Sequence, residues 1–149
     1  MLEIFVSSIS DPSFFYVQKS GPASVALDKL VQDMTSFYEQ NEDTCKVEMD
    51  TLVKGSVVAT KSSTDGSWYR ARVADIILDD YDDSKVCVEV DFVDFGDFES
   101  KSLHELCEIK KQFLKLKFQA IPASLADVKP ARYIFKFQPS KRKRNFIIF

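Results

Sequence analysis

The sequence predicts a mainly β protein of the α+β class, in which one long helix accompanies a small closed β-barrel. Residues 23–40 carry apolar side chains at helical spacing, whereas from residue 52 onward apolar and polar side chains alternate as they do in strands. Tight connections rich in Ser, Asp and Gly separate the later segments. Short strands joined by such turns favour a closed barrel, which removes exposed sheet edges. The 149 residues and 45% apolar composition fit one domain with its own core.

The N-terminal elements are two short strands and the helix. The strands are expected at residues 2–7 and 14–18. Residues 41–50 are polar and are expected to form a linker. The helix of residues 23–40 places one apolar face against the core, at i, i+3, i+4 and i+7 spacing: Leu27, Leu30, Val31, Met34, Phe37 and Tyr38.

The barrel strands and the segments after them follow. Residues 104–109 are expected to form a short turn, and residues 120–128 a further strand. The last segment, residues 131–149, mixes aromatic and basic side chains without a clear period, and we predict no structure for it. Four strands are expected to form the barrel: residues 52–60, 68–78, 85–95 and 98–103.

Strand alternation places Tyr69 inside the barrel and Trp68 outside it. Tyr69 shares one face of its strand with Ala71 and Val73. The other face carries arginines, which cannot lie unpaired in an apolar interior. Trp68, on that outer face, is expected to pack against the helix layer. Because Tyr69 stands at the start of its strand, it points inward at one end of the barrel.

Two further aromatic residues are expected at the same end. Phe92 continues a row of interior valines toward the end of the third barrel strand. Phe95 has the wrong parity for this row, but Gly96 provides the backbone freedom to swing its ring beside Phe92. Antiparallel pairing brings the start of one strand near the end of the next, so the three aromatic rings can meet at one mouth. Asp97 would then lie at its rim.

Three aromatic faces around a hole suit a cation that keeps much apolar surface, such as a methylated guanidinium. Asp97 can accept a guanidinium N–H, which favours arginine over a neutral residue. The alternative is that the three rings are ordinary plugs of the barrel core. Asp94 is expected to form a structural pair with Arg70 or Arg72.

Charge is distributed unevenly along the chain, although the net charge is only −3. Residues 75–99 hold ten acidic side chains and one basic one, whereas residues 129–144 hold seven basic side chains and no acidic one. The acidic part would attract a cationic partner and repel a phosphate backbone. The basic tail, which interleaves aromatic residues, leaves an alternative function open: an RNA or single-strand nucleic-acid binding module. A solvated tail or a nuclear import signal explains the same residues.

Neither a metal nor another cofactor is expected. Cys45, Cys87 and Cys107 are far apart and form no paired ligand motif, and His104 is the single histidine. Cys87 and Cys107 are expected to be small core residues in a reducing compartment. The sequence shows no signal peptide and no apolar run of about 20 residues, so we expect a soluble module without direct membrane contact.

Two segments resemble the double signature of Tudor domains. The sequence GSWYRARV at residues 66–73 resembles the family's WYRA strand, and VDFVDFGD at residues 90–97 resembles its later strand end, Y-x-D-Y-G-[ND]. The likeness covers about residues 2–128, and its N-terminal part resembles the staphylococcal-nuclease-like half of extended Tudor modules. It is greatest for the Tudor module of Tudor-KH proteins (Papi in insects), including LDKLV at residues 27–31 and FQAI at residues 118–121.

The resemblance implies which residues bind the ligand. Tyr69, Phe92 and Phe95 would be walls of an aromatic cage, and Asp97 would be its polar partner. The family's remaining cage aromatic falls at Ser63, which leaves one wall missing. The resemblance therefore implies an arginine reader with modest discrimination between dimethylated and plain arginine.

The resemblance also divides the chain. Residues 1–50 would begin the nuclease-like lobe, residues 51–105 would form an SH3-like Tudor barrel, and residues 106–130 would return into the lobe. Residues 131–149 match nothing in the family. Extended Tudor modules complete the lobe with a longer, helix-containing segment, so we expect a partial lobe here.

The implied function is that of a non-catalytic reader. It would bind arginine, expected to be symmetrically dimethylated, in the Arg-Gly or Arg-Ala tail of a Piwi-type Argonaute, as an adaptor of the piRNA pathway. The expected location is cytoplasmic, at germ granules or the mitochondrial outer surface through parts of a parent protein outside this chain. Nuclease activity, the enzymatic alternative, needs clustered carboxylates for calcium in the lobe, and the acidic run lies in the barrel instead.

Overall fold

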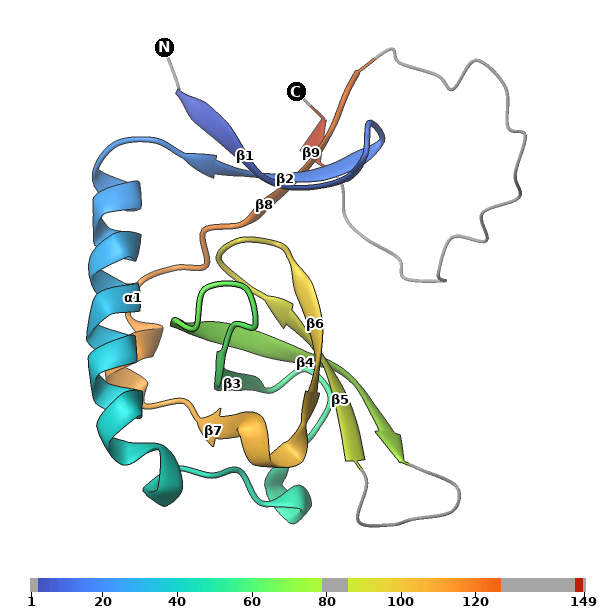
Figure 1. Cartoon of the computed structure of the whole chain (residues 1–149). Helices are drawn as coiled ribbons and strands as arrows, with labels where there is room; N and C mark the ends of the chain where they lie inside the picture. The colour runs from blue at the N-terminus through green and yellow to red at the C-terminus, as the bar shows by residue number, and fades with distance from the viewer. Residues whose placement is uncertain (1–2, 79–85, 127–146, 149) are drawn as a thin grey trace.

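The computed structural model describes residues 3–78, 86–126 and 147–148, which form two sheets and one long helix (Figure 1). One sheet has the strand order β6-β5-β4-β3-β7 and the other the order β1-β2-β8-β9. The elements are β1 (Ile4–Asp11), β2 (Phe14–Lys19), α1 (Pro22–Asn41), the 3-10 helices η1 (Glu42–Thr44) and η2 (Met49–Thr51), β3 (Val57–Lys61), β4 (Trp68–Leu78), β5 (Val86–Phe92), β6 (Phe98–Ser102), η3 (Leu103–Glu105), β7 (Leu106–Glu108), η4 (Lys111–Leu114), β8 (Ile121–Ser124) and β9 (Ile147–Ile148).

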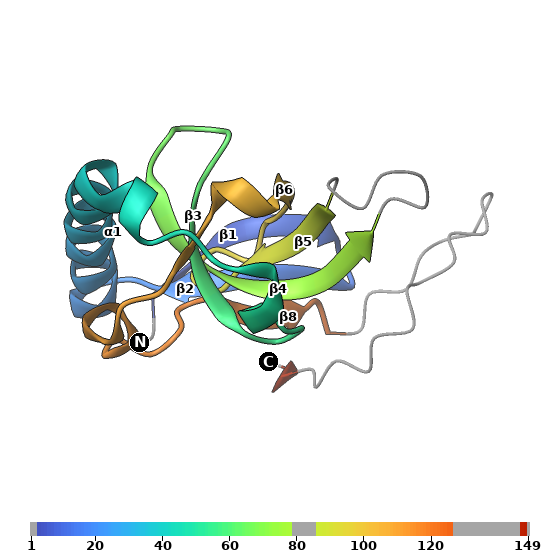
Figure 2. The same ribbon diagram turned by 90° about the horizontal axis from the view of Figure 1, so that it is seen from below.

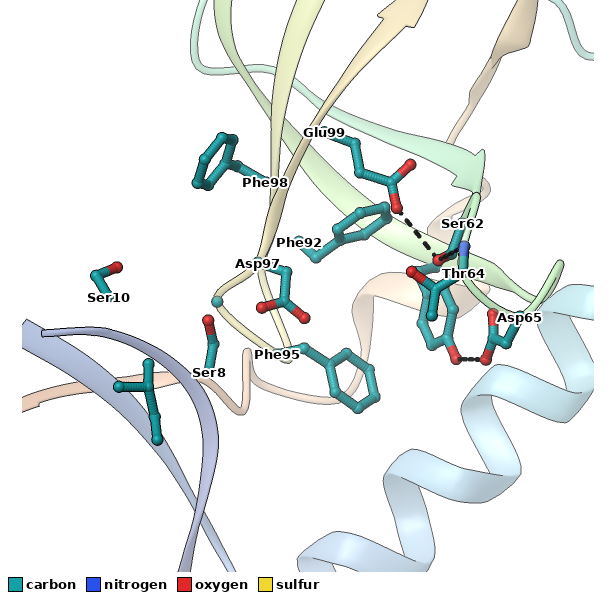
Figure 3. A pocket seen from close by; sticks show the side chains of 13 residues that line it. Ser8, Ser10, Ser62, Thr64, Asp65, Phe92, Phe95, Asp97, Phe98 and Glu99 are labelled. Atoms are coloured by element: carbon teal, nitrogen blue, oxygen red, sulfur yellow. Dashed lines mark hydrogen bonds between the residues drawn. The ribbon is translucent and has the colours of Figure 1, made fainter.

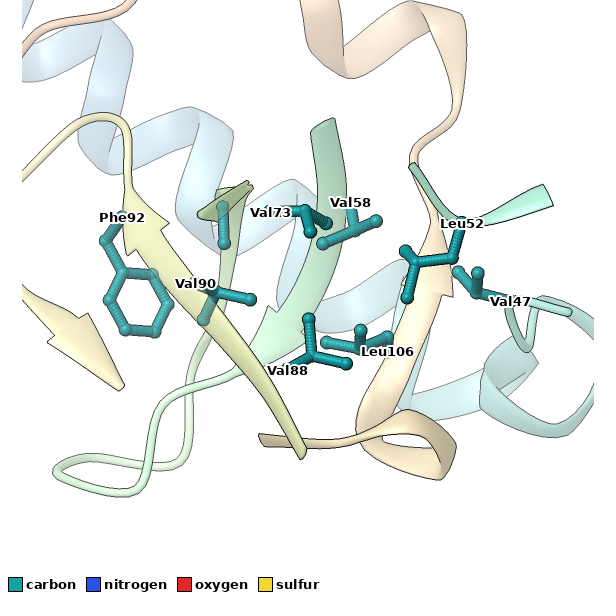
Figure 4. Close-up of a cluster of buried hydrophobic side chains, with 9 residues drawn as sticks. Val47, Leu52, Val58, Val73, Val88, Val90, Phe92 and Leu106 are labelled. Carbon is teal, nitrogen blue, oxygen red and sulfur yellow. The ribbon is translucent and has the colours of Figure 1, made fainter. Parts of the chain in front are cut away.

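The five-stranded sheet curls around an apolar core, as the alternation predicts (Figure 4). In β4 and β5, Ala71 lies opposite Phe92 and Val73 lies opposite Val90, and these four side chains are buried. A register shift after Val73 returns the later part of β4 to the same core. The predicted inner and outer faces of both strands are therefore confirmed.

The barrel contains a fifth strand that the sequence does not predict. Residues 104–109, expected as a turn, hold η3 and then β7, which pairs with β3. Leu106 enters the barrel core and Cys107 enters the layer under the helix, and both are fully buried. Because both faces of this three-residue strand are covered, it shows no polar–apolar alternation. The barrel sheet thus extends to Glu108, past the expected boundary at residue 105.

The first strand of the chain, expected at residues 2–7, spans Ile4–Asp11, and two boundaries of the barrel strands also lie several residues from the prediction. The third barrel strand ends at Phe92 rather than at Phe95, because residues 93–95 form a turn. The first begins at Val57 rather than at residue 52, because η2 and a turn at Gly55 occupy the preceding residues. Gly55 has φ 94°, which no extended strand accommodates.

Helix α1 covers one side of the barrel and continues alongside the second sheet (Figures 1 and 2). Pro22 stands in its first turn, where a missing N–H costs nothing. Trp68 is buried under this helix, stacked on Tyr38 with 5.0 Å between ring centroids, so its expected packing against the helix layer is confirmed. Cys107 lies in the same layer, but the prediction for Cys87 is wrong: it is half-buried on β5, outside the barrel core.

The second sheet lies across one end of the barrel (Figure 1). β1 and β2 form a hairpin with two register shifts, and β8 pairs with β2 where a strand over residues 120–128 was expected. Within the described part of the chain, no helix is long and apolar enough to cross a membrane. The basic segment 129–144 and the acidic loop 79–85 lie outside the described residues.

Candidate functional site

A hollow of about 480 Å³ opens where the barrel mouth faces β1 (Figure 3). Its floor and inner wall are aromatic, its rim carries carboxylates and hydroxyls, and both sheets contribute to it. The residues that line it are Ser8, Ile9, Ser10, Ser62, Thr64, Asp65, Tyr69, Phe92, Phe95, Gly96, Asp97, Phe98 and Glu99.

The structure brings the three predicted aromatic residues together in this hollow. The ring of Tyr69 lies 5.8 Å from that of Phe92 and 5.1 Å from that of Phe95, centroid to centroid. The interplanar angles of 77° and 80° make both contacts edge-to-face. Phe92 is buried at the floor, whereas Tyr69 and Phe95 are half-buried and keep ring surface toward the opening. Phe92 also belongs to the barrel core, and Tyr69 and Phe95 pack against that core.

A tight turn after β5 carries Phe95 to this position. The backbone N–H groups of Phe95 and Gly96 donate to the Phe92 carbonyl at 3.3 and 2.8 Å, and the Phe92 N–H donates to the Asp97 carbonyl at 2.8 Å. Gly96 has φ 90°, and a Cβ at this residue would lie 2.2 Å from the ring of Tyr16 in β2. The turn therefore requires glycine both for its conformation and for the close approach of the second sheet.

Asp97 follows this turn and lies exposed on the rim of the hollow, where the sequence places it. The Ser7 hydroxyl of β1 donates to the Phe95 carbonyl at 2.7 Å and ties the same turn to the second sheet. Sequence reasoning missed the contribution of β1, because strand alternation within the barrel says nothing about a neighbouring lobe.

A second carboxylate at the mouth was also missed. The Tyr69 hydroxyl donates to Asp65 Oδ2 at 2.6 Å, and the Ser67 N–H donates to Asp65 Oδ1 at 3.0 Å. The hydrogen bond from Tyr69 holds the pKa of Asp65 below its ordinary value, while burial, and then this bond, raises the pKa of Tyr69 to about 12. The position of Asp65 in a turn just before the Tyr69 strand was the available signal.

Ser63, the expected missing wall, does not line the hollow. Its backbone N–H and hydroxyl donate to Glu99, and its hydroxyl accepts a hydrogen bond from Lys101. Glu99 itself lines the hollow. Burial would raise the pKa of Glu99, but hydrogen bonds from Lys101 and Ser63 hold it below the ordinary value. The side of the mouth near Ser63 is thus polar, and Lys101 offsets the charge of its Glu99.

The predicted pairing of Asp94 is formed with Arg70. Arg70 donates to both oxygens of Asp94, at 2.8 and 2.6 Å, and the two side chains are 0% and 3% exposed. Arg70 also donates to the carbonyls of Phe113 and Leu116, at 3.0 and 2.7 Å, and Gln18 of β2 donates to the Asp94 carbonyl. This pair joins the barrel to the segment that returns into the second sheet, behind the aromatic mouth.

The site has the chemistry to bind a planar cation. Aromatic faces attract cations through their quadrupoles, and Asp65 and Asp97 add negative charge around the opening, whereas Lys101 offsets the charge of Glu99. The lining side chains include no basic group. In residues 3–78 and 86–126, no group of three or more His, Cys, Asp or Glu side chains could hold a metal ion.

Comparison with known sequences finds Tudor domains and the Tudor-KH proteins that contain them. The Tudor domain family model matches residues 1–127. The Tudor and KH domain-containing protein homolog of Bombyx mori is 42% identical over 87% of this chain, and that of Drosophila melanogaster is 39% identical over 86%. The chain spans 21% and 22% of these relatives, about a fifth of their length.

Solved structures agree with this family. The extended Tudor domain from BmPAPI superposes with a TM-score of 0.82 at 41% identity, covering 89% of this chain and 65% of that one. A variant of the Drosophila melanogaster Papi extended Tudor domain, in complex with a dimethylated Piwi N-terminal peptide, superposes with a TM-score of 0.82 at 36% identity. The match covers 87% of this chain and 62% of that one. The same variant with the unmethylated peptide superposes with a TM-score of 0.83 at 36% identity, covering 88% of this chain and 61% of that one. The chain belongs to the Tudor domain family, in its extended form.

Proposed function

We propose that this chain captures an arginine side chain from the disordered tail of a partner protein. Tyr69, Phe92 and Phe95 form the walls that face the guanidinium, and Asp97 accepts one of its N–H groups. The observation that carries the proposal is the convergence of three ring faces and an acidic rim on one hollow. The Drosophila melanogaster Papi extended Tudor domain, which has the same architecture, was solved in complex with Piwi N-terminal peptides, and these peptides are arginine-containing tails.

The ligand is arginine in both its plain and its symmetrically dimethylated form. One related domain is found with a Piwi peptide in each of these two states. In this chain the position expected to complete the aromatic cage is Ser63, whose side chain faces Glu99 and Lys101 instead. With one side of the mouth polar, the added methyl groups gain few apolar contacts, so discrimination between the two forms is modest.

The partner is a Piwi-type Argonaute, and the chain acts as a non-catalytic adaptor of the piRNA pathway. Its Tudor-KH relatives and the Piwi peptides in related structures support this partner. The site offers ring faces and carboxylates for binding, and the Tudor family is one of binding modules. The cytoplasm is the proposed location, at germ granules or the mitochondrial outer surface through other parts of a parent protein.

Isothermal titration calorimetry with three arginine–glycine peptides tests this function: unmethylated, symmetrically dimethylated and asymmetrically dimethylated. We expect affinity near the micromolar range, roughly −8 kcal/mol, for a short ligand that must be ordered on binding. Phe95→Ala should weaken binding about thirtyfold, because a desolvated cation–aromatic contact contributes ~2 kcal/mol.

Val25→Ala is the matched control for Phe95→Ala. Val25 is an exposed apolar residue on α1, outside the hollow, so its truncation should leave the affinity unchanged. Circular dichroism must show that both variants stay folded. Equal affinity of the wild type and a folded Phe95→Ala variant would rule out the aromatic site.

A further inference from the structure

The polar side of the mouth is built around a buried lysine. Lys101 Nζ lies 2.6 Å from Glu99 Oε2 and donates to the Ser63 hydroxyl at 2.9 Å, and its side chain is 2% exposed. Lys101 pairs with Val88 across β5 and β6, and Val88 belongs to the barrel core. Directly opposed residues of two strands share one face of a sheet. An ammonium is therefore buried on the interior side of the barrel, beneath the mouth.

A buried ammonium is costly unless it is paired and hydrogen-bonded. Within the described residues, Lys101 meets this requirement through groups at the mouth and just beyond it: Glu99, Ser63 and, at 3.9 Å, Glu105. Glu99 in turn accepts from the Ser63 N–H at 3.2 Å and from the Ser63 hydroxyl at 2.8 Å. The three side chains of Lys101, Glu99 and Ser63 form a clamp that fixes the loop between β3 and β4 to β6.

The clamped loop carries Asp65. Within it, the Ser62 N–H donates to the Ser67 carbonyl at 2.9 Å, and the Gly66 N–H donates to the Ser62 carbonyl at 3.0 Å. The loop is thus closed on itself above the paired ends of β3 and β4, and the clamp adds the contacts that join its Ser63 to β6. Asp65, at the tip of this loop, faces the hollow and accepts a hydrogen bond from the Tyr69 hydroxyl (Figure 3).

We propose that Lys101, through Glu99 and Ser63, is a positioning residue that holds Asp65 at the mouth as a carboxylate wall and thereby sets the preference between plain and dimethylated arginine. The proposal rests on the function proposed above. A plain guanidinium offers five N–H donors, and dimethylation replaces two of them with methyl groups. A carboxylate wall accepts N–H groups and gains nothing from methyl groups, so it favours the plain form.

A double-mutant cycle tests this proposal. The wild type, Lys101→Met, Asp65→Asn and the double variant are titrated with the plain and the symmetrically dimethylated peptide, and the ratio of the two dissociation constants is compared. Asp65→Asn should shift the ratio about tenfold toward the dimethylated peptide, because a charge-assisted hydrogen bond is lost. Lys101→Met should shift it in the same direction, and the double variant should show no further shift.

The ratio separates positioning from general stability, because a purely structural lysine would change both affinities alike. Ser63→Ala removes the exposed hydroxyl that donates to Glu99 and accepts from Lys101, while the Ser63 N–H still donates to Glu99. It should therefore shift the ratio in the same direction by a smaller factor, and it provides the test if Lys101→Met does not fold. Lys29→Met is the control: this exposed lysine pairs with Asp33 on α1, and its loss should leave the ratio unchanged.

Three outcomes would overturn the inference. In the first, Ser63→Ala and a folded Lys101→Met keep the wild-type ratio of dissociation constants, while Asp65→Asn shifts it. Another is a wild-type ratio in Asp65→Asn itself. In both cases the wild type still binds the peptides, so the proposed function survives. If the wild type binds neither peptide, the function and the inference fail together.

Discussion

At the scale of single residues, Tyr69 does two things at the mouth. Its ring makes edge-to-face contacts with Phe92 and Phe95, so it fixes the geometry of the aromatic walls. Its hydroxyl binds Asp65 and so connects these walls to the loop between β3 and β4. Strand alternation predicts the first role, because it depends on the direction of one side chain. The second depends on a loop conformation that has no periodic signal.

The raised pKa of Tyr69 predicts a pH dependence of stability. The ordinary value is 10.0, and burial and the Asp65 hydrogen bond raise the pKa to about 12 in the folded protein. Below pH 10 the Tyr69 phenol is protonated in both the folded and the unfolded state, so its contribution to the free energy of unfolding is fully present. Between pH 10 and 12 it ionises first in the unfolded chain, so the free energy of unfolding falls as pH rises.

Urea unfolding at about pH 9 and pH 11 measures this effect. The loss of unfolding free energy between the two pH values should be smaller in Tyr69→Phe than in the wild type. Tyr38, whose pKa burial also raises, titrates alike in both proteins, so it cancels in the comparison. An equal loss in both proteins would show that Tyr69 ionises normally in the folded state.

At the scale of elements, the turn after β5 decides where Phe95 and Asp97 lie. Gly96→Ala should therefore weaken both folding and peptide binding. The left-handed conformation costs an alanine about 1–2 kcal/mol, and the overlap with Tyr16 adds roughly 1–3 kcal/mol. Urea unfolding gives the stability, and calorimetry with the plain arginine peptide gives the affinity.

Gly55→Ala is the matched control, since Gly55 has φ 94° but no atom within 4 Å of an added Cβ. It should lose only the conformational cost, about 1–2 kcal/mol, and should bind the peptide as the wild type does. If Gly96→Ala loses no more stability than Gly55→Ala, the contact with Tyr16 is not constraining the turn.

The elements differ in how far sequence predicts them. β4 and α1 are long and periodic, and their predicted spans match the structure closely. β7 could not be predicted, because it is three residues long and buried on both faces. The end of β5 was placed too late because Val93 and Phe95 continue an apolar pattern that the backbone leaves at the turn.

At the scale of the whole molecule, the Arg70–Asp94 pair holds the barrel to the segment returning toward β8. Asp94→Ala leaves the guanidinium buried and unpaired, so it should destabilise the fold by about 3–5 kcal/mol in urea unfolding. The exposed pair Lys29–Asp33, with 3.0 Å between Nζ and Oδ2, provides the comparison. Asp33→Ala should lower the free energy of unfolding by less than about 1 kcal/mol. Similar losses in the two variants would contradict a structural role for the buried pair.

The candidate site is predictable only within the barrel. Tyr69, Phe92, Phe95 and Asp97 follow from strand parity, one glycine and a resemblance in sequence, and the structure places them around one hollow. Ser8 and Ser10 of β1 come from another sheet, and Lys101 is a charge at an interior position. Neither kind of residue can be found from local patterns, because both depend on which distant segments meet in the fold.

The acidic rim of the hollow gives a last prediction, on the electrostatics of the molecule. Asp65 and Asp97 stand at an opening without a basic lining residue, so they should attract an arginine-rich tail over a distance of several ångströms. The screening length shrinks from about 10 Å at 0.1 M salt to about 3 Å at 1 M. Raising the salt concentration should therefore lower the association rate more than it raises the dissociation rate.

Stopped-flow binding of a labelled arginine-rich peptide across this salt range measures the effect. Asp97→Asn removes one rim charge and should flatten the salt dependence of the association rate. Asp28→Asn removes the same charge from the exposed side of α1, away from the lining of the hollow, and should leave the slope near that of the wild type. Equal flattening by both variants would mean that the net charge of the chain, and not the rim of the site, attracts the ligand.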